Sequence, residues 1–121
     1  MIQKARLFGD SDTLKKMESE DDPVALKHLG KTIKDFSASI WKENIDGLLA
    51  KGLSAKFTQN EDLSMALKDT CTTILVEANP NDKIFGVGQS LFGKNIWDKQ
   101  TWCGENKMGK AERMNVRENL D

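Results

Sequence analysis

The sequence has few of the residues that mark linkers, metal sites and redox sites. Its 121 residues include two prolines, two cysteines and one histidine, His28. With so few prolines and no low-complexity tract, the chain shows no internal linker, and its length predicts one domain over residues 1–121. The cysteines, Cys71 and Cys103, form no Cys-x-x-Cys pair and are too few for a structural zinc site. We therefore expect no metal site and free, partly buried thiols, with a disulfide as the alternative.

The sequence also lacks a strong net charge and a long apolar run. Its formal net charge is −1, with 31% charged and 38% hydrophobic residues, which is typical of a globular protein. Because there is no basic excess, no broad field favours nucleic acid or an anionic membrane, and a small ligand is slightly favoured over a duplex. No apolar run approaches the ~18 residues that span a bilayer, and no signal pattern is present. We expect a cytoplasmic protein without membrane partners.

Capping residues and apolar spacing predict many short helices. We expect helices from the start to Gly9, over 11–20, from Asp22 to Gly30, over 39–60, from Asn60 to Thr70, and from 104–106 to near Asn119. The longest of them has an apolar face at intervals of three and four residues, formed by Trp41, Ile45, Leu48, Leu49, Leu53 and Phe57. Two glycines, Gly47 and Gly52, weaken this helix and predict a kink or a close contact.

The rest of the chain is organised around residues 73–89. The β-branched run Ile74-Leu75-Val76 predicts a short buried strand, which ends at Glu77. The following Asn-Pro-Asn breaks the strand into a turn that contains Asp82. An aromatic residue and two glycines come next: Phe85, Gly86 and Gly88. These patterns predict a ligand site within an α+β fold that is predominantly helical, with many short helices around a small β-sheet.

Several motifs follow one another in the order of one known family. They are Gln3-Lys4-Ala5 with Leu7-Phe8-Gly9-Asp10, Leu29-Gly30-Lys31, Asp35-Phe36, Trp41, Lys56-Phe57-x-Gln59-Asn60, Leu75-Val76-Glu77-Ala78-x-Pro80-x-Asp82, Gly86-x-Gly88, Gly104-x-Asn106 with Gly109, and Met114-x-Val116-Arg117. Each motif alone is weak, but their ordered spacing is specific and covers nearly the whole chain. The chain therefore resembles the NADAR family, also called the YbiA-like N-glycosidases.

The resemblance implies a compact, helix-rich α+β domain that hydrolyses N-glycosidic bonds and needs no metal or organic cofactor. Some members of the family are associated with ribosylaminopyrimidine phosphates of the riboflavin pathway. Others are associated with removal of ADP-ribose from guanine in nucleic acid. The expected partner is therefore a phosphorylated ribosyl-base or ADP-ribosyl substrate, which includes modified nucleic acid.

The chain departs from the family pattern at several places. Family members usually begin upstream, with a Ser-x-Glu-His/Gln-Tyr motif just before Gln3-Lys4, and the glutamate of that motif has no counterpart here. Phe85 stands where the family usually has tryptophan, and the segment between Gly109 and Met114 is longer by one residue, about 100° of helix rotation. The alternatives are a non-catalytic nucleotide- or ADP-ribose-binding domain, a truncated inactive member, or a fragment that needs a partner chain. The last alternative predicts an exposed apolar surface at three positions: Ile2, Ala5 and Phe8.

Two carboxylates are the candidate catalytic residues. Breaking a C1′–N bond requires a carboxylate that stabilises the sugar's charge or activates water, and a proton for the leaving base. We assign the first role to Asp82 and expect Glu77 to be an acid of raised pKa or a ligand of a sugar hydroxyl. The alternative for Asp82 is a side chain that forms its own turn, and for Glu77 an ion pair with a lysine or arginine.

The family pattern also provides candidate substrate contacts: Lys4, Lys56, Trp41, Phe85, Gln59, Asn60, Gly86 and Gly88. The lysines would bind phosphate, and the aromatic residues would stack on a base or form a wall of the site. The amides would read a base edge, and the glycines would offer backbone N–H groups to phosphate. The alternatives are solvated lysines, aromatic residues in the core, a helix cap at Asn60 and a simple turn at the glycines.

Overall fold

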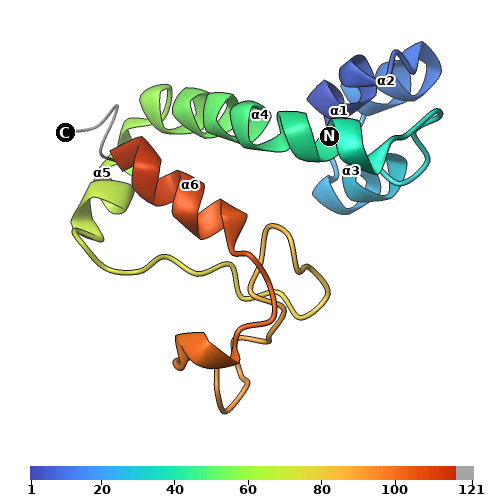
Figure 1. The fold of residues 1–121 in the computed structure, drawn as a ribbon. Coiled ribbons are helices and arrows are strands. Elements are labelled where there is room, and N and C mark those ends of the chain that lie inside the picture. Colours follow the sequence, from blue (N-terminus) through green and yellow to red (C-terminus); the bar gives the residue numbers. More distant parts are fainter. Residues whose placement is uncertain (117–121) are drawn as a thin grey trace. The chain divides into compact units, whose positions relative to one another are not determined.

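A computed structural model describes residues 1–116 and shows six α-helices and one short 3₁₀ helix in them (Figure 1). They are α1 (Ile2–Leu7), α2 (Ser11–Glu18), α3 (Pro23–Leu29), α4 (Ala38–Thr58), α5 (Glu61–Asp69), η1 (Lys99–Thr101) and α6 (Lys107–Asn115). Backbone contacts divide the chain into two compact units, an N-terminal unit, Met1–Ile45, and a C-terminal unit, Asp46–Asp121. The boundary between them falls within α4. Within residues 1–116, no helix has the length and hydrophobicity to cross a membrane.

The N-terminal unit has its own small core, in which α2 packs against both α1 and α3. Its buried residues are Ala5, Met17 and Ile33, and five half-buried residues pack around them: Ile2, Phe8, Leu14, Leu26 and Leu29. Of the three positions at which a fragment would expose an apolar surface, Ala5 is fully buried, and Ile2 and Phe8 are half-buried against the same cluster. The structure therefore does not show the surface that this alternative predicts.

Asp10 joins two segments of the N-terminal unit. Its Oδ1 accepts a hydrogen bond of 3.0 Å from the Thr13 backbone N–H and so caps α2. Its Oδ2 accepts a second bond of 3.0 Å from the backbone N–H of Lys34. These bonds, first from Lys34 and then from Thr13, stabilise the ionised form and lower the pKa of Asp10 to about 2.

Because the pKa of Asp10 is lowered, the stability of the N-terminal unit depends on pH in the acidic range. The contribution of Asp10 is complete above the ordinary pKa of 3.8 and is lost as the pH falls toward about 2, because the unfolded chain binds the proton first. We expect Asp10→Asn to lower stability near neutral pH and to flatten the loss of stability in this acid range. Asp12→Asn, at an exposed aspartate of the same helix, is the control. Its free energy of unfolding, measured with urea at each pH, should depend on pH as in the wild type. The same pH dependence in Asp10→Asn would contradict this account.

The core of the C-terminal unit joins α4, α5 and α6. Its buried residues are Leu53, Phe57, Leu67 and Val116, with Leu49, Leu63, Leu75, Met108 and Ala111 packed against them. The predicted apolar face of the long helix is confirmed here by Leu53 and Phe57. No close contact is found at Gly47 or Gly52, because a Cβ at either position would meet nothing within 4 Å, and the kink stays a prediction.

The predicted strand at Ile74–Val76 and its sheet are wrong, because none of residues 1–116 lies in a β-strand. The side chain of Asn106 takes the place of a neighbouring strand. Its Nδ2 donates to the Leu75 carbonyl at 2.9 Å, and its Oδ1 accepts from the Glu77 N–H at 3.0 Å. Since one side chain satisfies the backbone on both sides of Val76, no second strand is needed. The segment is not a buried strand either, because Ile74 is 58% exposed.

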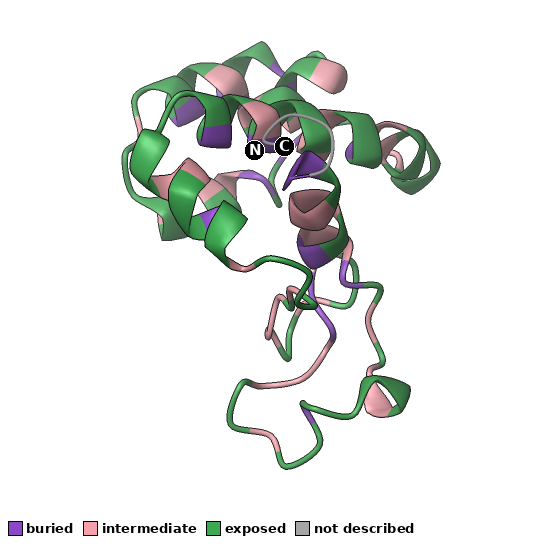
Figure 2. Ribbon diagram, turned by 90° about the vertical axis from the view of Figure 1, so that its left-hand side faces the viewer, coloured by how far each residue is buried: buried purple, intermediate pink, exposed green. Residues whose placement is uncertain are grey.

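The segment between α5 and α6 is mostly exposed or half-buried (Figure 2). Trp97 is 87% exposed and is no packing anchor, whereas Trp102 is half-buried and donates its indole N–H to the Ile96 carbonyl at 2.8 Å. Cys71 and Cys103 are free, as predicted, but exposed rather than partly buried. The last helix ends at Asn115 in the structure, and its predicted end near Asn119 lies outside the described residues.

Candidate functional site

The two predicted catalytic carboxylates belong to one turn of the C-terminal unit, closed on Gly86. A Cβ at Gly86 would lie 2.8 Å from the Asp82 carbonyl oxygen and 2.9 Å from that of Glu77. The Val87 N–H next to it donates to the Glu77 carbonyl at 3.0 Å. Only glycine fits here, so the sequence brings the backbone of Glu77 and Asp82 together by leaving out one side chain.

Asp82 organises this turn with one carboxylate oxygen. Its Oδ1 accepts hydrogen bonds from the backbone N–H groups of Ile84, at 3.0 Å, and Phe85, at 2.8 Å. This is the turn-forming role that the sequence left as the alternative. Among the described residues no donor binds Oδ2, so the second oxygen remains for a ligand. The catalytic role of Asp82 stays a prediction.

The start of α6 is bonded to the same turn. Backbone N–H groups of Asn106, Lys107 and Met108 donate to the carbonyls of residues 84–86 at 3.0–3.1 Å. These N–H groups are therefore already used and are not offered to an anion. Gly88, which has a φ of +72°, allows a second close approach, because a Cβ there would meet Cys103. Close packing thus accounts for Gly86 and Gly88, and their role toward phosphate stays a prediction.

Glu112 on α6 is a candidate functional residue that the sequence analysis missed. Burial raises the pKa of its carboxyl group, the positive charge of Lys56 lowers it, and the negative charge of Glu77 raises it. The three residues come from α6, α4 and the extended segment before the turn, so tertiary structure alone brings them together. Glu112 follows Gly109 by one helical turn, and Gly109 approaches Leu75, so the two residues lie on the same side of α6.

The predicted contacts at the end of α4 lie close to one another. Lys56 is exposed, with its Nζ 5.0 Å from the centre of the Phe57 ring. Asn60 begins α5, but its side chain makes no cap bond and instead donates to the Lys56 carbonyl at 2.7 Å. Gln59 is exposed, and Phe85 is half-buried beside the turn. These positions are compatible with ligand contact, which stays a prediction.

The remaining predicted contacts, Lys4 and Trp41, lie in the N-terminal unit and contact each other. The Lys4 Nζ donates to the Gly30 carbonyl at 2.8 Å and lies 4.4 Å from the ring centre of Phe36 and 5.4 Å from that of Trp41. Burial lowers the pKa of Lys4. This ammonium therefore has a structural role between two rings, whether or not it meets a ligand.

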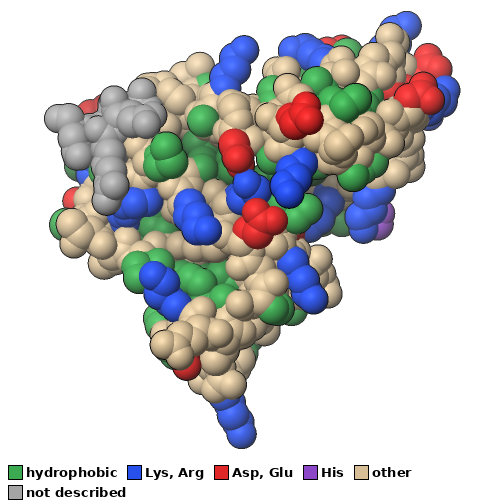
Figure 3. Space-filling model, in the orientation of Figure 1, with side chains coloured by type: hydrophobic (Ala, Val, Ile, Leu, Met, Phe, Trp, Pro, Cys, Tyr) green, Lys and Arg blue, Asp and Glu red, His purple; other side chains and the backbone are tan. Residues whose placement is uncertain are grey.

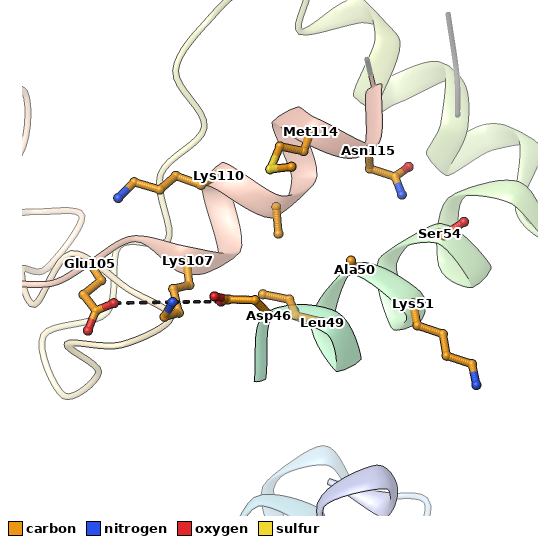
Figure 4. Close-up of a pocket in the computed structure, with 11 residues that line it drawn as sticks. Asp46, Leu49, Ala50, Lys51, Ser54, Glu105, Lys107, Lys110, Met114 and Asn115 are labelled. Carbon is orange, nitrogen blue, oxygen red and sulfur yellow. Dashed lines mark hydrogen bonds and ion pairs between the residues drawn. The ribbon is translucent and has the colours of Figure 1, made fainter. Parts of the chain in front are cut away.

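A cavity of about 600 Å³ lies between α4 and α6 in the C-terminal unit (Figure 4). At its edge Lys107 lies between Asp46, at 2.8 Å, and Glu105, at 3.5 Å. The hydrogen bond to Asp46 is the main reason that the pKa of Lys107 is raised. Lys51 and Lys110 point away from the cavity in Figure 4. The charge of the inward cation of this cavity is therefore balanced by two acids.

Comparison with known proteins supports the resemblance seen in the motifs. The model of a family described as the NADAR domain matches residues 1–121. The chain is 35% identical over 118 residues to "N-glycosidase R617" of Acanthamoeba polyphaga mimivirus, a match that covers 98% of this chain and 69% of that protein. It is 34% identical over 122 residues to "Protein irg-1" of Caenorhabditis elegans, covering 99% of this chain and 57% of that protein. No solved structure matches the chain.

Proposed function

Because the chain belongs to the NADAR family, we propose that it is an N-glycosidase that hydrolyses the C1′–N bond of a ribosylated base. The similarity of nearly the whole of this chain to a protein named N-glycosidase supports this activity. The family resemblance implies two substrate classes, a ribosylaminopyrimidine phosphate of the riboflavin pathway or ADP-ribosylated guanine. The chain spans 69% and 57% of the length of the two relatives, so the activity of a whole relative is carried over here as a proposal.

The observation that carries the proposal is the group formed by Glu112, Glu77 and Lys56. By analogy with glycosidases that use two carboxyl groups, hydrolysis of an N-glycoside is assisted by one neutral carboxylic acid and one carboxylate in the same site. Burial favours the neutral form of Glu112. The positive charge of Lys56 opposes this effect on Glu112, and the negative charge of Glu77, a second carboxyl group, adds to it. A buried carboxyl group beside a second one is the arrangement that separates an acid from a base in a site with two carboxyl groups.

In the proposed reaction the C1′–N bond breaks as the sugar carbon gains positive charge. The proton of the Glu112 carboxylic acid passes to the leaving nitrogen of the base. A carboxylate of the turn, Asp82 or Glu77, stabilises the charge at C1′ and accepts a proton from the attacking water, whose oxygen forms the new bond to C1′. The proton on the turn carboxylate then passes through solvent water to Glu112, so both carboxyl groups return to their starting states. The products are the free base and the sugar with a new hydroxyl group.

A binding domain without catalysis is the second candidate function. It is favoured by the two backbone hydrogen bonds to Asp82 Oδ1, which give this carboxylate a structural reason to be present. A domain of this kind would hold a nucleotide or ADP-ribose without cleaving it.

Replacing Asp82 by asparagine distinguishes the two candidates. The asparagine oxygen can accept the same two backbone bonds, so the turn should survive, but the amide cannot accept a proton from water. We expect hydrolysis to fall by about 10²–10⁴-fold. The increase of melting temperature produced by ADP-ribose should largely remain, because binding to the native state alone stabilises it. Asp98→Asn is the matched control, since Asp98 also accepts a turn N–H, at 3.0 Å from Gln100. Wild-type turnover in Asp82→Asn would rule out the catalytic role of Asp82.

A further inference from the structure

A second cavity, of about 850 Å³, lies in the C-terminal unit. Residues 71–75 line one side of it, and residues of α6 and of the region around η1 line the others. Its charged lining residues are all cations: Lys68, Lys99, Lys110 and Arg113. No aspartate or glutamate of the described residues lines it. This distribution differs from the cavity between α4 and α6, where two acids neutralise the inward lysine. In a chain whose net charge is −1, a cavity lined by cations alone is a local departure from charge balance.

Arg113 is fixed in the wall of this cavity without losing its charge. Its Nη2 donates to Thr70 Oγ1 at 2.9 Å and to the Thr73 carbonyl at 2.7 Å, and its Nη1 donates to the Cys71 carbonyl. All three acceptors are neutral. Its Nε is buried and has no hydrogen-bond partner among the described residues. The guanidinium is therefore held rigidly and fully charged, with two of its five N–H donors unused, one on Nη1 and the other on the buried Nε.

The lysines of the cavity are also without acid partners. Among residues 1–116 no ion pair involves Lys68, Lys99 or Lys110. Each of these lysines is exposed, so each ammonium can reach a ligand at the mouth of the cavity. Several cations around one opening attract a multiply charged anion such as a phosphate more strongly than a single carboxylate.

The cavity also offers a flat apolar surface. The half-buried Trp102 lines it, and the bond from its indole N–H to the Ile96 carbonyl holds the ring in place. Ile74 and Met114, also in the lining, are 58% and 55% exposed. Figure 3 shows one face of the molecule, with hydrophobic side chains in green, lysine and arginine in blue, and aspartate and glutamate in red. An aromatic ring beside cations suits a ligand that carries both a planar base and a phosphate.

We propose that this cavity binds a nucleotide, with its phosphate on the lysines and Arg113 and its base against Trp102. This proposal rests on the proposed function in one respect, namely that the bound nucleotide is part of the substrate. The nucleotide is either free in solution or part of a single strand, because both present the same phosphate and the same base face.

A charge-removing variant with a matched control tests the phosphate contact. Lys99→Gln removes a cation of the cavity, and Lys94→Gln removes an exposed lysine of the same segment that does not line it. We expect Lys99→Gln to weaken AMP binding by about tenfold in calorimetry, as for the loss of one charged hydrogen bond, and Lys94→Gln to leave it unchanged. Inorganic phosphate should bind more weakly than AMP and compete with it. Equal AMP affinity in both variants, or no AMP binding by the wild type, overturns the proposal.

The base contact is tested separately with the two tryptophans. Trp102→Leu should weaken AMP binding by about tenfold or more, the usual loss of one stacked base, and leave the affinity for inorganic phosphate unchanged. Trp102→Phe keeps an aromatic face and should restore most of the loss, even though it cannot bond Ile96. Trp97→Leu is the control, because Trp97 is 87% exposed and does not line the cavity. A loss of AMP affinity of the same size in Trp97→Leu would contradict the contact between the base and Trp102.

Two further arms identify the source of the nucleotide and separate this proposal from the proposed function. If the nucleotide belongs to a single strand, an oligonucleotide should bind more tightly than AMP, and Lys99→Gln should reduce its salt dependence by ~0.7 in the log–log slope. If it is free, the oligonucleotide should bind no better than AMP. Glu112→Gln should bind AMP like the wild type. If the protein hydrolyses its substrate and Lys99→Gln does not change the rate, the nucleotide site in this cavity is wrong and the glycosidase proposal remains. If the protein binds AMP but hydrolyses nothing, the glycosidase proposal is wrong and the nucleotide site remains.

Discussion

Glu112→Gln is expected to lower the rate of hydrolysis by about 10²–10⁴-fold, the usual contribution of a general acid. The amide has nearly the shape of the carboxyl group but has no acidic proton for the leaving base. The loss should be largest for substrates whose base is a poor leaving group. The measurement is the rate of base release under substrate saturation. Glu105→Gln is the control, because Glu105 is exposed just before the same helix and pairs with Lys107.

The pH profile separates this catalytic role from a structural one. Since the pKa of Glu112 is raised by burial, the wild-type rate should fall as the pH rises through this raised value, where the acid loses its proton. The same deprotonation buries a charge, so any stability that neutral Glu112 preserves is lost in the same direction of pH. Glu112→Gln should therefore lack this limb of the profile and be at least as stable as the wild type at neutral pH. A variant with the wild-type rate and profile would contradict the assignment.

Gly109→Ala is expected to destabilise the C-terminal unit by at least about 2 kcal/mol. In an exposed helix interior this change stabilises by about 1 kcal/mol, because alanine is the better helix former. At position 109 the opposite is expected, since the new Cβ would overlap the Leu75 carbonyl group and lie 2.8 Å from Asn106 Nδ2. The backbone that Asn106 holds in place of a strand would have to move. Urea unfolding measures the difference.

Gly52→Ala provides the matched control for this prediction. Gly52 lies inside α4, and a Cβ there would meet nothing within 4 Å. We expect this variant to be more stable by about 0.5–1 kcal/mol, the intrinsic difference between the two residues in a helix. If both glycine variants stabilise the protein, α6 does not make the close contact with the extended segment before the turn that this prediction requires.

The helices were predictable because their signals are local. Asp10 and Asp22 cap α2 and α3 with their side chains, and Pro23 fits the first turn of α3. The apolar spacing of α4 likewise needs only the helical repeat, and the core confirms Leu53 and Phe57. Residues within a few positions of each other determine these features, so no tertiary information is required.

The missing strand shows where local reasoning fails. Three apolar residues in a row indicate extended backbone, and Leu75 is indeed packed on the core. Whether such a segment joins a sheet depends on what satisfies its N–H and C=O groups. Here a side chain distant in sequence, Asn106, does so. That pairing has no signature in the sequence of residues 74–76.

The candidate site was predictable in part for the same reason. Glu77, Asp82 and Gly86 belong to one turn, and their nearness follows from a short stretch of chain. Glu112 was missed because its environment is made by α4 and the turn, which the sequence does not place beside α6. The lysines around the second cavity were missed in the same way, since each of them alone has the pattern of a solvated residue.

The measurement that tests the central claim most directly is mass-spectrometric product analysis of the purified protein. It is offered a ribosylaminopyrimidine phosphate and, separately, an oligonucleotide with ADP-ribosylated guanine. The account predicts release of the free base or of ADP-ribose from one of them, and loss of this product in Glu112→Gln. No product from either substrate, from protein that unfolds cooperatively and binds AMP, would contradict the glycosidase and favour the binding domain.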